Sequence, residues 1–347
     1  MTRKKNRIII ATRGSKLALW QANWIKAELE KSSPDIEIEL NKIKTTGDKI
    51  LDVPLAKVGG KGLFVKEIEE ALLQGDADLA VHSMKDVPVD LPAGLRIAAI
   101  CEREDPRDAL ISQNQKSKIK NQKFKDLPHG ARIGTSSLRR ACQLSNIRPD
   151  LEIVQLRGNL DTRMRKLDEG QFDAIIVAAA GVKRLGMSKR ITEILESDIS
   201  LSAIGQGAIG IECRVDDEFI NNLLKPLDHI ETSICVRAER AFLKKLEGGC
   251  QVPIAAYARI VSQELEKTTE VKKIGSWEDK NSSTSQPLNF SSPILIMDGL
   301  VGSVAGDKII RGSIEGIPDN AEQLGIELAE DLISKGAGEI LAEVYKR

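Results

Sequence analysis

The chain has few aromatic residues, no excess of charge and no long apolar run. Aromatic side chains make up 3% of its 347 residues, and 51 Lys and Arg balance 51 Asp and Glu. A nucleic-acid-binding surface usually combines net positive charge with aromatic platforms for bases, so this composition argues against that class. No apolar run approaches the roughly 20 residues that a membrane span needs. We therefore expect no nucleic-acid partner and no membrane partner.

The N-terminal residues are basic, but only a short apolar stretch follows them. Residues 8–11 are apolar and end at Thr12, which is too short for the apolar region of a signal peptide. We therefore expect a cytoplasmic protein, or the processed form of an organelle protein such as one of the plastid stroma.

Cysteine and histidine are also scarce. The five cysteines are odd in number, no Cys-x-x-Cys occurs, and the three histidines are scattered. This argues against a disulfide framework and a zinc site, so we expect no metal. One special thiol stays possible at Cys250, which two glycines and Pro253 bracket in a loop after a helix predicted over 230–246. The other cysteines, at 101, 142, 213 and 235, fall in or beside predicted strands and helices.

The sharpest chemical feature follows one short strand. Residues 79–81 form a buried apolar strand, and Pro88 prevents the segment from continuing as a helix. Ser83, Lys85 and Asp86 therefore lie at a strand's carboxyl end, where open α/β sheets bind ligands. There Lys85 can hold an anion while Asp86 stabilises a cation. The alternative is a pair of solvated loop charges that contributes little.

Two places share one plan of strand, small polar turn and helix. A strand over 7–11 leads to Arg13 and Ser15, and a strand over 132–134 leads to Thr135 and Ser137. A helix that starts at such a turn exposes free amides, which suit an anion. Serine at a helix start is first of all an N-cap, and this alternative is strong.

The tryptophans of the first predicted helix follow a helical period. Leu17, Trp20, Trp24 and Ala27 fall on one stripe. We interpret both tryptophans as core residues in preference to a platform for a ligand.

A basic, glycine-rich loop covers residues 57–64. It lacks the spacing of a phosphate-binding P-loop, so a nucleotide site is rejected. A mobile lid that carries Lys57, Lys61 and Phe64 is the more plausible interpretation.

Arginine accumulates in the middle of the chain. Between residues 134 and 166 seven basic residues face three acidic ones, a local charge of +4 in a neutral chain. Six of the seven are arginines, whose forked side chains bind carboxylates and phosphates through two hydrogen bonds. Arg157 follows a strand predicted over 153–156, so it too lies at a strand's carboxyl end. A solvated helix face explains Arg165 and Lys166 better than Arg157.

These elements predict an α/β fold with three domains. The first is discontinuous (1–102 and 203–227), because the character of the chain changes near 101–106 and a flexible segment at 202–207 leads back. The second covers 103–202 and contains a nearly continuous apolar strand, as in a parallel sheet. The third covers 228–347, a small α+β domain with a polar insertion near 263–293.

Taken together, these motifs closely resemble the porphobilinogen deaminase (hydroxymethylbilane synthase) family, from about residue 9 to residue 345. Several long motifs occur in the family's order. The motifs are Thr12–Ser15, Lys57–Phe64, His82–Pro88, Gly134–Arg140, Leu156–Arg163, Gly205–Glu212 and Glu247–Pro253.

The resemblance implies a fold and a reaction. The first two domains would be like the halves of a type II periplasmic-binding-protein fold, with the active site in their cleft. The enzyme would join four porphobilinogen molecules head to tail, release ammonia at each addition and yield hydroxymethylbilane for tetrapyrrole (haem, chlorophyll) biosynthesis. A covalent dipyrromethane cofactor would be attached through Cys250. We expect a monomer.

The resemblance also implies roles for single residues. Asp86 would be the catalytic carboxylate. Cys250, Ser83, Lys85, Thr135, Ser137, Arg139 and Arg140 would bind the cofactor. Arg13, Ser15, Arg157, Arg163 and Arg184 would bind the substrate or the growing chain.

Two features leave questions open. The segment near 263–293 is longer than the family pattern and has no assigned role. The main alternative function is a non-enzymatic binder of small carboxylates on the same bilobal fold, which would need the arginines but neither Asp86 nor Cys250.

Overall fold

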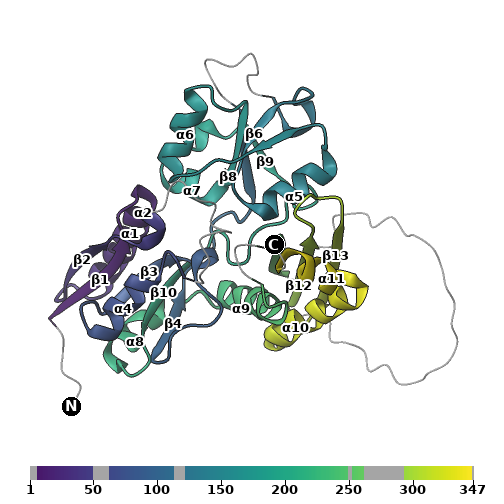
Figure 1. Cartoon of the computed structure of the whole chain (residues 1–347). Coiled ribbons are helices and arrows are strands. Elements are labelled where there is room, and N and C mark those ends of the chain that lie inside the picture. The colour runs from purple at the N-terminus through teal and green to yellow at the C-terminus, as the bar shows by residue number, and fades with distance from the viewer. Residues whose placement is uncertain (1–5, 50–61, 113–121, 249–251, 262–292, 346–347) are drawn as a thin grey trace, which may run out of the picture.

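The computed structural model describes residues 6–49, 62–112, 122–248, 252–261 and 293–345. These form three parts, each built on its own sheet (Figure 1). The strands of the first sheet come from two segments, residues 7–100 and 209–214. The strands of the second sheet lie between these segments, at 108–195, and those of the third come from residues 254–316. The predicted α/β fold with a small third domain is confirmed; the residue boundaries of the three domains remain a prediction.

The first sheet has five strands in the order β2-β1-β3-β10-β4. Parallel pairing joins β1 to β2 and β3, whereas β10 runs antiparallel between β3 and β4. The strands are β1 (Arg7–Arg13), β2 (Glu37–Ile43), β3 (Leu79–Ser83), β4 (Leu95–Ile100) and β10 (Ile209–Arg214). The helices of this part are α1 (Lys16–Ser32), α2 (Thr46–Lys49), α4 (Lys66–Gln74) and α8 (Glu218–Leu224).

The second sheet repeats this arrangement in the order β7-β6-β8-β5-β9. Here β5, the first strand after the chain crosses from the first part to the second, runs antiparallel between β8 and β9. The strands are β5 (Asp108–Ile111), β6 (Arg132–Gly134), β7 (Glu152–Val154), β8 (Ala174–Ala178) and β9 (Glu193–Leu195). The helices are α5 (Leu138–Ile147), α6 (Leu160–Asp168) and α7 (Ala179–Arg184).

The third part is a three-stranded antiparallel sheet covered by helices. Its order is β11-β12-β13, with β11 (Ile254–Val261), β12 (Ile294–Gly302) and β13 (Ile309–Gly316). The helices are α9 (Ile230–Lys245), α10 (Ala321–Leu332) and α11 (Gly338–Tyr345). Phe242, Met297 and Leu328 lie in one buried cluster between sheet and helices.

A buried ion pair joins the third part to the two crossings, the segments near Arg103 and Gly205 through which the chain passes between the first and second parts. Arg103, just after β4, donates from Nη1 and Nη2 to the two carboxylate oxygens of Glu239 on α9, at 2.6 and 3.1 Å. Glu239 also accepts from the backbone amides of Gly205, at 2.7 Å, and Ala258, at 2.9 Å. One carboxylate with no exposed surface therefore fixes both crossings against β11.

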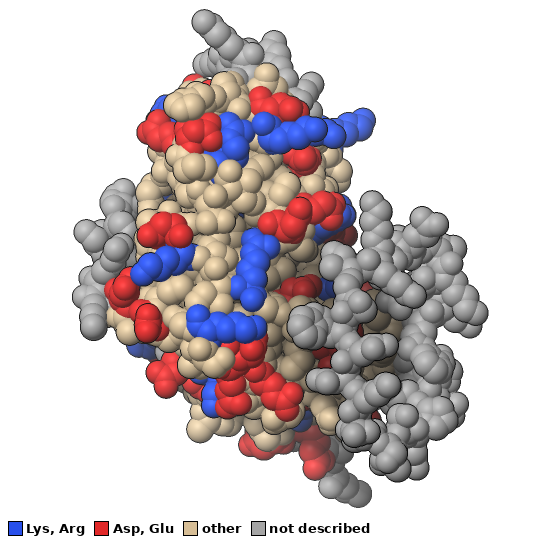
Figure 2. Space-filling view, turned by 90° about the vertical axis from the view of Figure 1, so that its right-hand side faces the viewer, with Lys and Arg blue, Asp and Glu red and all other residues tan. Residues whose placement is uncertain are grey.

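Positive and negative side chains are interspersed on the face of the molecule shown in Figure 2. This distribution matches the zero net charge of the whole chain. Among the described residues no helix is both long and apolar enough to cross a membrane.

Candidate functional site

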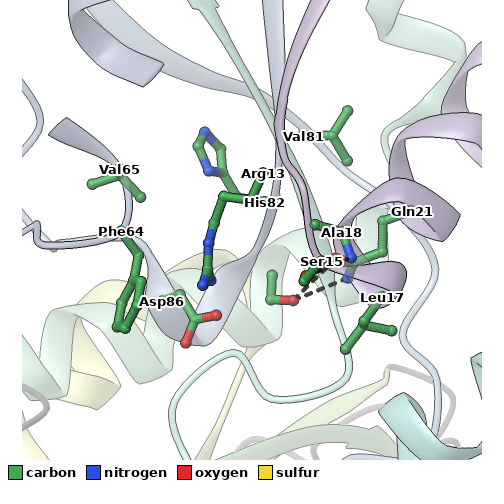
Figure 3. A pocket seen from close by; sticks show the side chains of 11 residues that line it. Arg13, Ser15, Leu17, Ala18, Gln21, Phe64, Val65, Val81, His82 and Asp86 are labelled. Carbon is green, nitrogen blue, oxygen red and sulfur yellow. Dashed lines mark hydrogen bonds between the residues drawn. The ribbon is translucent and has the colours of Figure 1, made fainter. Parts of the chain in front are cut away.

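A pocket opens at the carboxyl ends of β1 and β3. Both strands run in the same direction, so the residues after them meet at one edge of the first sheet. Figure 3 shows their side chains gathered around this edge. The lining residues include Arg13, Ser15, Gln21, Phe64, His82, Ser83 and Asp86.

Asp86 reaches the pocket from a 3₁₀ turn that follows β3 directly. In Figure 3 its carboxylate and the Arg13 guanidinium point toward the same space. The Arg13 guanidinium also lies 4.3 Å from the centre of the Phe64 ring. The returning chain packs closely behind the turn, since a Cβ at Gly210 would lie 2.1 Å from Met84 Sδ. Packing therefore fixes the backbone that carries Asp86.

Lys85 lies beside Asp86 and is half-buried. Burial, together with the charges of Arg140 and Arg139, lowers the pKa of Lys85 to about 8, while Asp86 and Asp108 act in the opposite sense. No carboxylate among the described residues lies within 4 Å of the Lys85 ammonium. The site around Lys85 therefore has an unmet preference for an anion.

The serines of the site have defined local roles. Ser15 Oγ accepts from the Ala18 amide at 3.3 Å, and Ser137 Oγ accepts from the Arg140 amide at 3.4 Å. Both are N-caps, so the strong alternative for these serines is right. A ligand role would be additional. Ser83 differs, because the buried Gln21 side chain donates to its Oγ at 3.0 Å. Sequence reasoning missed Gln21.

Arg139 and Arg140 begin α5 and are buried, each 5% exposed. Asp108, at the start of β5, accepts from Arg139 Nη2 at 2.8 Å and from Arg140 Nη2 at 2.7 Å. Burial alone would raise the pKa of Asp108, but the two guanidiniums hold it well below its usual range. Gln206 Nε2 donates to the same carboxylate at 2.8 Å. The nearby Thr135 is buried, and its hydroxyl accepts from the Ser137 amide at 3.2 Å.

The Asp108 carboxylate does not satisfy every N–H donor of Arg139 and Arg140. Arg140 Nε is buried and has no hydrogen-bond partner among the described residues. Sequence reasoning missed Asp108 because its strand position gave no hint of two arginine partners thirty residues further on. The one local signal for an ion-paired Asp108 was the alternation of acidic and basic residues over 102–108.

Three further arginines predicted for substrate binding come from the second part. Arg163 donates from Nε to the Gly158 carbonyl at 2.8 Å, and Arg184 donates from Nη2 to the Gly207 carbonyl at 2.7 Å. Burial, together with the charges of Arg140 and Arg157, lowers the pKa of Arg163 to about 10, and Asp86 opposes this. Arg163 thus lies within electrostatic reach of Asp86, although the two come from different sheets. Arg157 is half-buried beyond the end of β7.

The remaining basic residues of the 134–166 cluster serve local structure. Arg148 pairs with Asp150 at 2.7 Å, and Arg165 pairs with Glu169 at 3.0 Å on an exposed helix face. The solvated-face interpretation of Arg165 is right.

The interpretation of both tryptophans as core residues is wrong for Trp20. Its side chain is 36% exposed, whereas Trp24 is half-buried and packs against the core of the first part. The two rings stack with centres 6.5 Å apart, so the helical stripe is real but only its later turn is covered.

The described cysteines are poor nucleophiles. All four are free and buried, and burial raises the pKa of each thiol to about 11 or 12. Cys250, Lys57 and Lys61 lie outside the described residues. No group of three or more His, Cys, Asp and Glu side chains in the described part is arranged to hold a metal ion.

The donor set fits a group that carries several carboxylates. Lys85 and Arg163 have lowered pKa values, and the buried Nε of Arg140 lacks a partner. Carboxylates placed among these cations would relieve both conditions.

Comparisons with known proteins identify the family of this chain. A family model described as "Porphobilinogen deaminase, dipyromethane cofactor binding domain" matches residues 8–222, and "Porphobilinogen deaminase, C-terminal domain" matches residues 233–334. The chain belongs to the porphobilinogen deaminase family. The predictions of this family, of its enzyme class and of a dipyrromethane cofactor are confirmed.

Curated relatives match along nearly the whole chain. The porphobilinogen deaminase of Geobacter sp. (strain M21) is 53% identical over 338 residues, which cover 97% of this chain and 95% of the relative. That of Geobacter sulfurreducens is 53% identical over 342 residues, 99% of this chain and 96% of the relative.

Solved structures of more distant proteins also match. The periplasmic VFT2 domain of Bordetella pertussis BvgS has a TM-score of 0.37 and 15% identity, and the match covers 63% of this chain and 85% of that one. The aliphatic sulphonate binding protein SsuA from Escherichia coli has a TM-score of 0.36 and 14% identity, with 70% and 71% covered.

Proposed function

We propose that this chain is a working porphobilinogen deaminase that assembles hydroxymethylbilane from four porphobilinogen molecules on a dipyrromethane attached through Cys250. The observation that carries the proposal is the position of Asp86: its carboxylate and the Arg13 guanidinium point into one pocket, and its charge also acts on Lys85 and on Arg163 of the second part. Such a site suits a substrate that bears carboxylates and becomes cationic at one carbon during reaction.

Asp86 stabilises the cation that forms when substrate loses ammonia. The bond between the aminomethyl carbon and its nitrogen breaks, ammonia leaves, and positive charge spreads over the pyrrole. A carboxylate about 4 Å away contributes roughly 4 kcal/mol at an effective dielectric constant near 20, which corresponds to a thousandfold effect on rate. When the new carbon–carbon bond has formed, the ring carbon that made it loses its proton, and Asp86 accepts that proton.

The basic and hydroxyl side chains of the site divide into two proposed groups. Lys85, Thr135, Ser137, Arg139 and Arg140 hold the carboxylates of the dipyrromethane, which supplies the nucleophilic ring carbon and the tether for the growing chain. A second group holds the carboxylates of the incoming substrate or of the growing chain: Arg13, Ser15, Arg157, Arg163 and Arg184. Ser83 supports the first group.

Cys250 is the proposed attachment site. The other four thiols are buried and hold their protons, which supports attachment elsewhere. Intact-mass measurement of purified protein tests this directly. We expect a mass above that of the sequence by one dipyrromethane unit, lost in Cys250→Ser and kept in the control Cys213→Ala. An active protein without the adduct, or with the adduct on another cysteine, would overturn the assignment.

The same measurement separates the proposal from its alternative. A non-enzymatic carboxylate binder would bind porphobilinogen but would carry no adduct and release no ammonia. Ammonia release and formation of hydroxymethylbilane by the purified chain are therefore the deciding readouts.

We further propose that the chain acts as a monomer in the cytoplasm and serves haem biosynthesis, and chlorophyll biosynthesis where the cell makes it. The curated relatives above are bacterial, which supports the cytoplasm. We also propose the domain boundaries given above, at 102/103, 202/203 and 227/228. Light scattering at assay concentration tests the monomer: a dimer mass would refute it.

A further inference from the structure

Trp20 is an exposed aromatic residue beside Arg184 to which neither the family resemblance nor the proposed roles assign a part. It lies on α1, one turn beyond the Ser15 cap, and its large apolar side chain is 36% exposed.

The ring of Trp20 faces a proposed substrate-binding arginine. The Arg184 guanidinium, at the end of α7, lies 5.8 Å from the centre of the Trp20 ring. Its Nη2 donates to the Gly207 carbonyl at 2.7 Å. The guanidinium is thus held between an aromatic face and one carbonyl, and no carboxylate among the described residues lies within 4 Å of it. A guanidinium stacked on a ring keeps its edge available for the forked binding of a carboxylate.

Two neighbouring contacts show that α1 faces the second part of the molecule along this line. Lys16 pairs with Asp161 of α6 at 3.3 Å. Leu17 lies so close to α7 that a Cβ at Gly181 would be 3.3 Å from its Cδ2. Trp20 is one helical turn beyond these residues, so its contact with Arg184 continues the same seam.

We propose that Trp20 is a positioning residue, which holds Arg184 edge-on in the cleft for a carboxylate of the incoming porphobilinogen or of the growing chain. The inference rests on the proposed function and adds to it a residue that acts through Arg184. Trp20 contributes through the face of its ring, and its contact crosses from the first part of the molecule to the second.

The test compares Trp20→Phe, Trp20→Leu and Arg184→Lys in the adduct-bearing protein. Leucine keeps apolar volume but has no ring face, whereas phenylalanine keeps one. We expect Trp20→Leu to raise KM for porphobilinogen about fivefold with less than a twofold change in kcat, and Trp20→Phe to stay near wild type. Trp24→Phe is the matched control, since Trp24 lies one turn later on the same helix and phenylalanine keeps a ring against Trp20. Its KM should be unchanged, although its Tm falls.

A double-mutant cycle shows whether Trp20 acts through Arg184. In the Arg184→Lys background, Trp20→Leu should raise KM less than twofold, because the guanidinium that it orients is gone. An unchanged KM in Trp20→Leu, equal losses in the Phe and Leu variants, or full additivity with Arg184→Lys would each overturn the inference. If the wild-type chain binds no dipyrromethane and releases no ammonia, the proposed function fails and the inference fails with it. An active wild type with an unaffected Trp20→Leu refutes the inference alone.

Discussion

His82 and Glu212 are hydrogen-bonded between neighbouring strands of the first sheet, with His82 Nε2 3.0 Å from Glu212 Oε2 and both side chains buried. Glu69 of α4 lies close enough for both to act on its charge. One oxygen of Glu69 and one of Glu212 are buried without a hydrogen-bond partner among the described residues. The pocket that contains Asp86 is therefore backed by two buried carboxyl groups and one imidazole.

We predict that Glu69 makes the protein less stable at alkaline pH. Burial and the charge of Glu212 raise the pKa of Glu69 from 4.5 to about 7. A carboxyl whose pKa is raised on folding binds its proton more tightly in the native state. Its stabilising effect is therefore complete below about pH 4.5 and is lost as the pH rises through 7.

Thermal unfolding at several pH values checks this prediction. Wild-type Tm should fall between pH 5.5 and 8.5 more steeply than the Tm of Glu69→Gln, which cannot ionise at this position. Glu70→Gln, on the same helix, is the control and should follow wild type. Parallel slopes for Glu69→Gln and wild type would contradict the prediction.

Asp108→Asn should destabilise the second part and weaken retention of the dipyrromethane. The variant leaves two buried guanidiniums without their carboxylate, a change that costs about 3–5 kcal/mol. Asp150→Asn removes the more exposed partner of Arg148 in the same part and should cost about 1 kcal/mol or less. Urea unfolding and intact mass measure both effects. Equal losses in the two variants would show that Asp108 has no special role.

Asp86→Asn should lower turnover about a thousandfold while the protein keeps its fold and its covalent adduct. The substitution preserves size and removes the charge that offsets the substrate cation. Asp90→Asn is a suitable control, because Asp90 is exposed on the same loop and pairs with Lys244 at 3.0 Å. The assay is ammonia release by purified protein of known adduct content. Turnover of Asp86→Asn within tenfold of wild type would remove Asp86 from the mechanism.

Gly207→Ala should be far more damaging than Gly186→Ala. Both glycines have positive φ, +91° and +70°, so both substitutions carry a backbone cost of about 1 kcal/mol. A Cβ at 207 would also lie 2.2 Å from the Glu104 carbonyl oxygen, whereas a Cβ at 186 meets nothing within 4 Å. Tm should therefore fall several times further for Gly207→Ala, and its KM should rise because the Gly207 carbonyl accepts from Arg184. Similar Tm losses would show that the chain relaxes around residue 104.

The strands predicted over 7–11, 79–81, 132–134 and 153–156 and the helix predicted over 230–246 agree with the structure to within two residues at each end, because short apolar runs bounded by glycine and proline are strong local signals. It also predicted that Ser83, Lys85 and Asp86 follow a strand, since that depends only on local order. What it could not predict were pairings between distant segments. The contact of Asp108 with Arg139 and Arg140 depends on β5 lying beside β8, which no local pattern encodes.

The misassignment of Trp20 has the same cause. Helical spacing shows which residues share a stripe, but not how far along the helix a neighbouring element covers that stripe. The core of the first part covers Trp24 in the third turn of α1, whereas Trp20, at the start of the second turn, faces Arg184 of α7, so Trp24 is packed and Trp20 is partly open.

The position of β10 has a consequence for how the chain is made. This strand separates β3 from β4, which do not pair directly, yet it leaves the ribosome only after every strand of the second sheet. The second sheet can therefore complete itself while the first still has two unpaired edges. A nascent chain at this stage exposes backbone donors and acceptors that other chains can pair with. The nascent chain is therefore prone to aggregation during a defined period, which begins when β4 emerges and ends when β10 is inserted.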